Sequence, residues 1–365
     1  MITFKTLQKW LPRGYGFLPY HFRPDRALPP AQVFFEVTYR CNLRCEMCHY
    51  LEIIEHTETR RAFKQELSAE GFRQVIERLP RFSLITFTGG EAFMKQDALD
   101  LLGFAARRHK VHVITNGTLL TPRTVEFLVE RRVRRWWSPG LFYLGVSLEG
   151  GESLHDRITQ VPGSFRKTTE GLERLMAARG PHRFPLVHLT CVINRGTVGE
   201  MTGLYDYAER MNVDVMNFVL HNPAQYNHYS GYDHEAVLRR PAPPVEPIEP
   251  KVLRDVLDQL EDKSRRHRTR LRFSPNGITR GEIIRYYSNK SRYTDYRCYV
   301  PWSKMAVSAY GDLFSCPHVP LGNVMSASPE AGWSGERARR FRQMLKREKI
   351  FPGCLGCCQS EYVGP

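Results

Sequence analysis

The amino-acid sequence predicts an α/β protein built from parallel βαβ units. Between residues 31 and 220, six short apolar runs alternate with five amphipathic segments of helical length. The helical segments begin at residues that favour helix starts, such as Ser68 and the pair Thr121 and Pro122. Six such units form either a curved, partly closed barrel or an open doubly wound sheet.

Each element follows from its own pattern. The buried strands are expected at 32–39, 83–88, 110–115, 141–148, 185–193 and 213–220. The helices between them are expected at 68–79, 96–109, 121–132, 163–179 and 198–211. In such folds the chemistry lies at the carboxyl ends of the strands. The segment directly after the first strand is therefore where we expect a catalytic loop.

The pattern weakens after residue 220. Residues 221–250 are polar and aromatic and then proline-rich, which indicates a loop and a linker, and a helix is expected at about 250–267. Three tyrosines of this loop suit stacking on a polar ring, although they could equally pack on the barrel: Tyr226, Tyr229 and Tyr232. The domains expected are an N-terminal arm (1–30), a core (31–220), a substrate loop with linker and helix (221–290) and a cysteine-rich domain (291–365).

The chain has 365 residues and a net charge of +15, which favours acidic partners. The basic segments 261–273 and 336–349 are expected to be solvated helix faces, and without a nucleic-acid motif we expect no nucleic acid. No stretch is apolar enough for a membrane span or a secretory signal, so a cytoplasmic location is expected. The basic, aromatic N-terminal arm either packs over the core, which we favour, or lies on a membrane surface.

The chain contains nine cysteines, an odd number that argues against a framework of disulfides alone. Cys41, Cys45 and Cys48 lie within eight positions of one another, after the first strand. A cubane iron–sulfur cluster normally takes four thiolates, so three would leave one iron open for a small molecule. A structural zinc site would need a fourth ligand, and His49 directly follows Cys48, where its geometry is poor for the same metal.

The spacing Cys-x3-Cys-x2-Cys on the first strand of a βα chain resembles the radical S-adenosylmethionine (radical SAM) superfamily. The resemblance implies a partial (β/α)6 barrel in which Cys41, Cys45 and Cys48 hold a [4Fe–4S] cluster. It also implies that a reductant such as flavodoxin or ferredoxin drives cleavage of S-adenosylmethionine (SAM). The resulting 5′-deoxyadenosyl radical would then remove a hydrogen atom from a substrate.

Further motifs resemble the same family in the expected order: "TGGEAF", "ITNGTLL", "VSLEG" and "HDRITQVPGSF". The resemblance implies that SAM is contacted by Met47, Gly89, Gly90, Glu91, Thr115, Asn116, Ser147, Glu149, Arg157 and Asn194. The two glycines would let the backbone approach the ligand, and Glu91 would accept a hydrogen bond from the SAM ammonium. The sequence departs from the family at Thr159, where an arginine is usual, so Arg157 is expected to take over the contact with the SAM carboxylate.

The C-terminal cysteines resemble the SPASM and twitch extensions of this family, which hold auxiliary iron–sulfur clusters. Cys298 is followed by Gly311 and Cys316 at the family's spacing, and "CLGCC" closes the set. The resemblance implies one auxiliary [4Fe–4S] cluster of the twitch type on Cys298, Cys316, Cys354 and Cys357. Cys358 is spare or replaces Cys357. A zinc ribbon on the same four thiolates is the alternative.

The substrate is less well defined by the sequence. The basic charge and the tyrosine-rich loop favour a polar, sugar-like or nucleotide-like small molecule that undergoes oxidation or epimerisation. Epimerisation needs a hydrogen-atom donor, for which Cys191 and Cys358 are the unassigned thiols, although Cys191 also fits a buried core position. Modification of a peptide is the alternative, but the 40 residues before Cys41 are too few for a winged-helix leader-binding domain. The non-enzyme alternative is a zinc- or cluster-bearing scaffold for nucleic acid or membrane.

Overall fold

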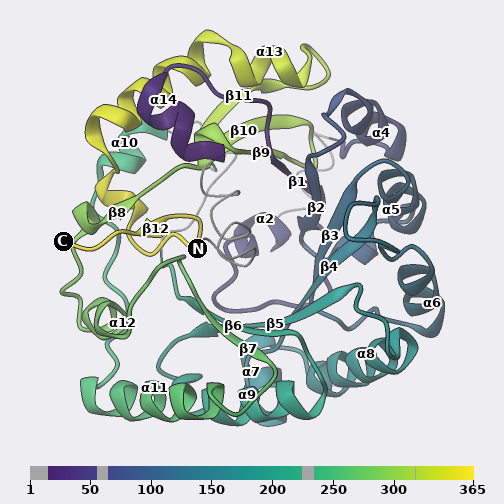
Figure 1. The fold of residues 1–365 in the computed structure, drawn as a ribbon, viewed down its shortest axis with the longest axis vertical. Helices are drawn as coiled ribbons and strands as arrows, with labels where there is room; N and C mark the ends of the chain where they lie inside the picture. The colour runs from purple at the N-terminus through teal and green to yellow at the C-terminus, as the bar shows by residue number, and fades with distance from the viewer. Residues whose placement is uncertain (1–14, 56–64, 224–233, 317) are drawn as a thin grey trace, which may run out of the picture.

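The computed structural model describes residues 15–55, 65–223, 234–316 and 318–365. Its main sheet has ten strands in the order β11-β10-β9-β1-β2-β3-β4-β5-β6-β7 and curves around an interior (Figure 1). Neighbouring strands from β1 to β7 are parallel, and β9 is parallel to β1, whereas β10 and β11 are added in antiparallel fashion. The predicted α/β class is therefore confirmed, in the form of a partial barrel.

The predicted elements agree with the structure to within a few residues. The parallel barrel strands are β1 (Gln32–Thr38), β2 (Leu84–Gly89), β3 (Lys110–Thr115), β4 (Gly140–Ser147), β5 (Leu186–Ile193), β6 (Val215–Leu220) and β7 (Arg270–Ser274). The helices that follow them are α2 (Leu51–Glu55), α4 (Ala69–Arg78), α5 (Ala98–Ala106), α6 (Pro122–Glu130), α7 (Glu152–Thr159), α8 (Ser164–Arg179), α9 (Met201–Arg210), α10 (His234–Arg239), α11 (Pro250–Ser264) and α12 (Arg280–Tyr287).

Side chains at the predicted helix starts form the expected caps. The Ser68 hydroxyl accepts a hydrogen bond from the Gly71 N–H at the start of α4. The Thr121 hydroxyl accepts from the Thr124 N–H at the start of α6, where Pro122 is the first helical residue. Such caps satisfy backbone donors that a helix leaves without partners in its first turn.

The apolar core lies between the sheet and the outer helices. On β5, the side chains of Val187, Leu189, Cys191 and Ile193 are fully buried in this core. Since successive side chains of a strand point to opposite faces, the residues between them face the barrel interior. The same alternation assigns an outer and an inner set of side chains to the other barrel strands.

The seventh barrel strand was missed by the sequence analysis. The basic segment 261–273 is not one helix face, because α11 ends at Ser264 and β7 begins at Arg270 beside β6. The range 221–290 thus holds a strand and two further helices, α10 and α12, besides the predicted linker and helix. In β7 the arginines at 270 and 272 alternate with Leu271 and Phe273, which is strand periodicity within a run of basic residues.

The C-terminal region extends the barrel sheet. Its elements are β8 (Tyr296–Arg297), β9 (Lys304–Val307), β10 (Asp312–Cys316), β11 (Val319–Asn323), α13 (Pro329–Ser334), α14 (Glu336–Glu348) and β12 (Glu361–Tyr362). The strand β9 pairs with β1 from Gln32 opposite Lys304 onward. The segment 336–349 forms α14, as expected for a basic helix face.

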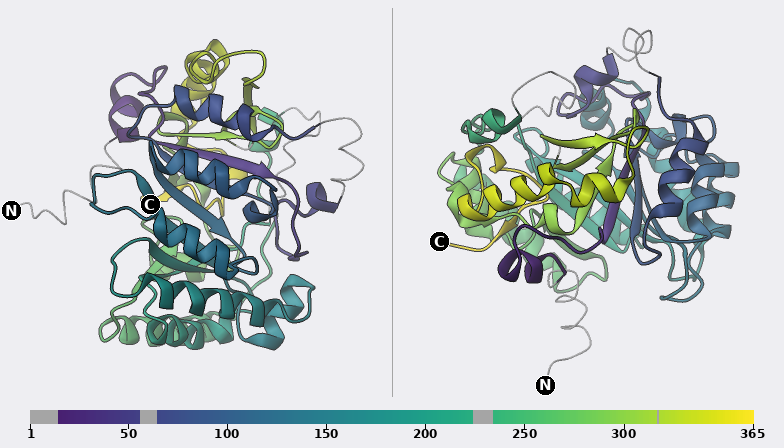
Figure 2. Two further views of the ribbon diagram at one scale, coloured as in Figure 1. Left: turned by 90° about the vertical axis from the view of Figure 1, so that its right-hand side faces the viewer. Right: turned by 90° about the horizontal axis from the view of Figure 1, so that it is seen from above.

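The described part of the N-terminal arm packs over the core, as predicted. A helix there covers residues 15–22, and the ring of its buried Tyr20 lies edge-on to Trp302 at 4.9 Å. In the left view of Figure 2 the barrel strands point to the right, and this purple helix lies at their amino ends, on the left. Within the described residues, no helix has the length and apolarity needed to cross a membrane.

Candidate functional site

The three N-terminal cysteines lie on the loop that leaves β1 at the carboxyl end of the barrel. The Cys48 N–H donates to the Cys45 carbonyl at 3.0 Å, which makes a tight turn. The N–H groups of Arg44 and Glu46 donate to the last two carbonyls of α7, at 3.0 and 3.1 Å. The end of α7 therefore fixes the conformation of the cysteine loop.

The neighbouring strand exits also contact the cysteines. The Cys41 Sγ lies 3.5 Å from the Leu43 N–H and 4.0 Å from the Asn116 amide, both of which can donate to it. Asn116, a predicted SAM contact, also donates to the Asn42 side chain at 2.9 Å. Burial raises the pKa of Cys48 to about 11. Because metals bind thiolates, assembly of a cluster here must release protons.

The donor set of this loop fits an iron–sulfur cluster with one open iron. Burial also raises the pKa of Cys45, and the nearby Cys48 and Cys41 raise it further, so the three thiols lie close enough to interact. In the described part of the chain, no three His, Cys, Asp or Glu side chains converge as ligands of a single metal ion. Three thiolates on one loop would instead hold three corners of a cubane.

Gly89 and Gly90 allow a close approach between two strand exits. In the structure they let the end of β2 lie against the exit of β1, and their approach to SAM stays a prediction. A Cβ on Gly90 would lie 2.3 Å from the Arg40 carbonyl oxygen, and one on Gly89 would lie 2.4 Å from that of Thr38. Gly89 also has a φ of +122°, which other residues rarely adopt.

We expect Gly90→Ala to destabilise the fold by about 3 kcal/mol, because its Cβ would collide with backbone that cannot rotate away. Gly203→Ala is the matched control, since a Cβ at that position within α9 meets no atom within 4 Å. The control should be neutral or stabilising by up to about 1 kcal/mol. Urea unfolding of both variants measures the difference, and equal midpoints would contradict the tight approach of β2 to the cysteine loop.

Glu91 is fully buried and its carboxylate already has three protein donors. It accepts from the Asn116 N–H at 2.7 Å, the Thr115 hydroxyl at 2.8 Å and the Phe93 N–H at 3.1 Å. Burial raises the pKa of Glu91. In this structure Glu91 thus ties the exit of β2 to that of β3, and its contact with the SAM ammonium stays a prediction.

Glu149 makes the corresponding link between β4 and β5. It is 5% exposed, and its carboxylate accepts from the Val192 N–H at 2.8 Å. The Glu149 N–H donates to His155 Nδ1 at 3.1 Å. Burial lowers the pKa of His155 to about 4, so the ring is neutral and Nδ1 can accept. Burial likewise raises the pKa of Glu149 to about 7.

The raised pKa of Glu149 makes stability depend on pH. The folded state binds this proton more tightly than the unfolded state does, so its stabilisation is complete below pH 4.5 and is lost as the pH rises through about 7. The variant Glu149→Gln lacks this titrating group. The change in its free energy of unfolding with pH should therefore be smaller by up to about 3 kcal/mol. Urea unfolding at pH 5.5 and pH 8 measures it, with the exposed Glu46→Gln as control. If both variants change equally between the two pH values, the assignment is wrong.

Cys191 lies beside Glu149 but on the outer face of β5. Its side chain is 0% exposed and belongs to the core between sheet and helices. A thiol in this position cannot reach a substrate in the barrel interior. The structure therefore argues against Cys191 as a hydrogen-atom donor and favours the buried core cysteine that the sequence analysis also considered.

The remaining predicted SAM contacts lie at the carboxyl end of the barrel. Ser147 is the half-buried last residue of β4, and Met47 is half-buried in the cysteine loop. The Asn194 side chain accepts from the N–H groups of Gly196 and Thr197, at 2.8 and 2.9 Å, in the turn after β5. A Cβ on Gly196 would lie 3.9 Å from the exposed Arg157, so the structure brings Arg157 to the same turn.

The segment 155–165, from which Arg157 is predicted to contact SAM, also supports the cysteine loop. The Asp156 carboxylate accepts from the Phe165 N–H and the Ser164 hydroxyl, each at 2.8 Å, and so caps α8. Thr159 stands where the family usually has an arginine, and its hydroxyl bonds that of Ser164 at 2.6 Å. These contacts hold the end of α7, which in turn holds the cysteine loop.

Polar side chains line the barrel interior, and the sequence analysis missed them. On β7, Arg272 Nε donates to the Asn217 side chain at 2.9 Å. The rings of His112 and His188 lie 5.2 Å apart, across Gly145, where a Cβ would lie 2.3 Å from the His188 ring. Burial lowers the pKa of His188 to about 4, so its ring is neutral. The signal was available for three of them, since His112, His188 and Asn217 each lie in an otherwise mostly apolar strand.

The C-terminal cysteines gather at the amino end of the barrel. Cys316 ends β10, which runs antiparallel to β9, and the Cys357 N–H donates to the Cys354 carbonyl at 3.1 Å. Burial raises the pKa of Cys298 to about 12, with a further contribution from the nearby Cys357. Burial also raises the pKa of Cys354, which Cys316, Cys298 and Cys357 raise further. The four predicted ligands are thus neighbours in space.

Cys358 directly follows Cys357, and its pKa is raised by the protein around the thiol and further by the nearby Cys357. The Cys358 side chain is exposed, and its Sγ lies 3.8 Å from the Gln359 amide nitrogen. Gln359 in turn accepts a hydrogen bond from Lys304 Nζ at 2.6 Å. Cys358 also influences the charge of Arg272, so this end of the chain borders the barrel interior. Tyr226, Tyr229 and Tyr232 lie outside the described residues.

Known proteins share both halves of this arrangement. A family model described as the radical SAM superfamily matches residues 35–208, and one described as a SPASM iron–sulfur cluster-binding domain matches residues 298–358. The Fe-coproporphyrin III synthase of Methanosarcina barkeri is 30% identical over 50% of this chain and 41% of its own. The subtilosin biosynthesis protein AlbA of Bacillus subtilis is 30% identical over 40% of this chain and 30% of its own. This chain thus spans less than half of either relative.

Among solved structures, Streptococcus suis SuiB bound to its precursor peptide SuiA aligns with 98% of this chain and 76% of its own. The TM-score is 0.63 at 14% identity, which shows a shared fold. The two family models lie on the two cysteine sites that the structure brings to opposite ends of one barrel. The chain belongs to the radical SAM superfamily and carries its SPASM domain, and the cofactors that go with them are SAM, a [4Fe–4S] cluster and auxiliary iron–sulfur.

Proposed function

We propose that this enzyme modifies a peptide inside the barrel, between the two cysteine sites. One observation carries the proposal: thiols lie at both ends of an interior whose wall is polar. The loop of Cys41 leaves β1 at its carboxyl end, whereas Cys316 ends β10 near Lys304, at the amino end. A substrate between them is within reach of both cofactors.

Three groups of residues would have separate roles in the reaction. Cys41, Cys45 and Cys48 would hold the cluster that, when bound, supplies the electron for cleavage of SAM to methionine and a 5′-deoxyadenosyl radical. The strand exits around Asn116, Ser147 and Asn194 would orient SAM. The four C-terminal thiolates would hold the auxiliary cluster in position to accept an electron from the substrate. The domain limits proposed are 1–30, 31–220, 221–290 and 291–365.

The barrel wall would position the substrate. Arg272 offers a cation for a carboxylate, and Asn217 and the neutral His188 offer hydrogen bonds to amide groups. Solvent reaches Arg272, although protein surrounds it and burial lowers its pKa. These groups suit a peptide bond and a carboxylate better than an apolar ligand.

The comparisons support a peptide better than the sugar-like substrate that the sequence analysis favoured. AlbA is named for the biosynthesis of a bacteriocin, and SuiB holds a precursor peptide. A second candidate is an iron porphyrin, because the other relative is named as an Fe-coproporphyrin III synthase. Arg272 would then bind a side-chain carboxylate of the ring. Oxidation is the expected outcome in either case, with the auxiliary cluster as electron acceptor. Cys191 is not available as a donor for epimerisation, which would need Cys358 instead.

The test is an anaerobic reaction of the reconstituted enzyme with SAM and a reductant such as reduced flavodoxin. The substrates to compare are peptides encoded beside the gene, iron coproporphyrin III and a nucleotide sugar. We expect that 5′-deoxyadenosine forms in proportion to the modified peptide, and that only the peptide changes in mass. A mass change of the porphyrin alone would establish the second candidate, and a change of the sugar alone would restore the small-molecule hypothesis.

Arg272→Ala should raise KM for the peptide about tenfold, because one charge-assisted hydrogen bond to a carboxylate is lost. The matched control is Arg268→Ala, since Arg268 is exposed before β7 begins and does not line the interior. SAM cleavage without substrate should be unchanged in both variants. An unchanged KM in Arg272→Ala would remove Arg272 from the substrate site.

A further inference from the structure

The amino end of the barrel is strongly basic. Seven segments connect a helix to the barrel strand that follows it: 23–31, 79–83, 107–109, 131–139, 180–185, 211–214 and 265–269. Together they contain thirteen arginines and two aspartates, and neither lysine nor glutamate. The five segments that connect β1 to β5 with the next α-helix, at the opposite end, contain four basic and five acidic residues. The excess of positive charge thus belongs to one end of the barrel.

Most of these arginines are exposed to solvent and can bind a partner. Ten of the thirteen are exposed, and only a few pair with carboxylates near the adjoining helix ends, such as Arg265 with Glu261. One of the two aspartates, Asp214, is neutralised by Arg179 at the end of α8. Such a concentration of uncompensated charge attracts an anionic partner.

Large apolar side chains project from the same end. Seven of the eleven exposed large apolar side chains among the described residues lie here: Phe17, Leu18, Phe22, Leu28, Phe82, Trp136 and Trp137. The two tryptophans are 58% and 62% exposed on the loop before β4. Phe82 precedes β2 and lies beside Tyr15 of the N-terminal helix, with ring centroids 6.1 Å apart. The apolar groups therefore come from separate segments around one end.

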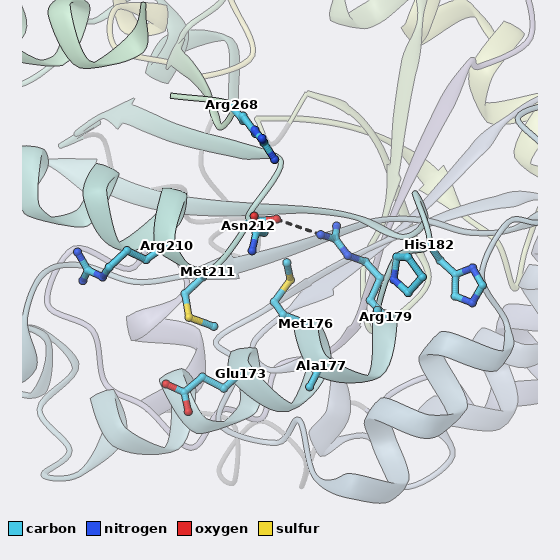
Figure 3. A pocket seen from close by; sticks show the side chains of 11 residues that line it. Glu173, Met176, Ala177, Arg179, His182, Arg210, Met211, Asn212 and Arg268 are labelled. Carbon is cyan, nitrogen blue, oxygen red and sulfur yellow. Dashed lines mark hydrogen bonds between the residues drawn. The ribbon is translucent and has the colours of Figure 1, made fainter. Parts of the chain in front are cut away.

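A basic groove opens at this end as well. Its volume is about 630 Å³, and it lies between the end of α8 and the segments before β5, β6 and β7. Figure 3 shows His182, Arg210 and Arg268 around it, with Glu173 as its acidic member. With Arg210 and Arg268 at its edge, the groove has the size and charge to accept a phosphate head group.

We propose that the amino end of the barrel docks on an anionic lipid bilayer. Tryptophan is favoured at the boundary between water and acyl chains, and arginine binds the phosphates of anionic lipids. Aliphatic side chains such as Leu18 and Leu28 suit insertion into a bilayer and do not stack on bases, which disfavours a nucleic acid. The cysteine loop lies at the opposite end, so docking leaves the carboxyl end of the barrel open to substrate.

The experiment uses the reconstituted full chain and sedimentation with vesicles under anaerobic conditions. Vesicles of phosphatidylcholine alone are compared with vesicles that also contain phosphatidylglycerol. We expect binding only to the anionic vesicles, and a loss of binding as salt is raised. Glycerol phosphate should compete only weakly, since the groove alone lacks the apolar contacts.

Two variants locate the surface. Trp136→Ala/Trp137→Ala should weaken binding more than tenfold, because two large apolar groups no longer insert. Arg134→Glu/Arg135→Glu should weaken it about a hundredfold or more, at roughly 1 kcal/mol for each charge removed near an anionic surface. The controls are Met325→Ala, 74% exposed after β11, and Lys251→Glu/Arg254→Glu on α11, which changes net charge by the same amount. Formation of 5′-deoxyadenosine should be unchanged in all four proteins.

Equal binding to both kinds of vesicle, or equal loss in variants and controls, would overturn the proposal. The protein could instead bind a single-stranded oligonucleotide tightly and not bind vesicles. If the two variants abolish that binding, the surface is a nucleic-acid site. Glycerol phosphate that displaces the vesicles completely would reduce the site to a phosphate groove.

Discussion

Replacing Cys41 by alanine is expected to abolish 5′-deoxyadenosine formation. The variant keeps only two of the three thiolates at this site, and the loop has no fourth cysteine to replace Cys41. Two thiolates are too few to hold the cluster. Iron should fall from about eight to about four per chain, because each [4Fe–4S] cluster contributes four. The measurements are iron and sulfide content after anaerobic reconstitution, and 5′-deoxyadenosine after addition of a reductant.

Cys191→Ala is the matched control, because Cys191 is the cysteine that the structure buries in the core. It should keep about eight irons per chain and unchanged SAM cleavage. Full iron content in Cys41→Ala, or zinc in place of iron in the parent chain, would contradict the assignment of the N-terminal site. Loss of product in the control alone, with iron retained, would restore Cys191 as a hydrogen-atom donor.

Much of the fold could be predicted from the sequence because buried parallel strands are apolar and their helices carry distinct caps. The strand β7 escaped because its arginines face a solvated interior, so that its apolar residues alternate with charge. The pairing of β9 with β1 was also out of reach, since contacts between residues so far apart leave no local pattern.

The cysteine ligands could be predicted because their spacing is specific, whereas the supporting contacts could not. Nothing local to Gly90 reveals that it meets the Arg40 carbonyl, which lies at the exit of the neighbouring strand β1. Glu91 and Glu149 also tie neighbouring strand exits together, a role that the sequence did not indicate, and their predicted contacts with SAM stay predictions. Such roles depend on which strands lie side by side, and sequence spacing does not contain that information.

Cys298→Ala should separate the two reactions of the enzyme. The variant should lose about four irons and form no modified substrate, because the electron from the substrate has no acceptor. It should still cleave SAM, since the cysteine loop after β1 lies at the other end of the barrel. Iron content, 5′-deoxyadenosine and substrate mass are measured on the same sample. Burial of Cys298 means that its removal also tests folding, so the melting temperature is recorded alongside.

Cys358→Ala is the control that decides between the adjacent thiols. Cys358 is the exposed cysteine and is not among the thiols that raise the pKa of Cys354, so the variant should keep all its iron and its activity. If instead Cys358→Ala loses iron and Cys357→Ala does not, Cys358 is the fourth ligand. A zinc ribbon would show one zinc in place of four irons, with no change in the substrate reaction when the metal is removed. The product, more than the metal count, therefore establishes whether this site transfers electrons or only stabilises the fold.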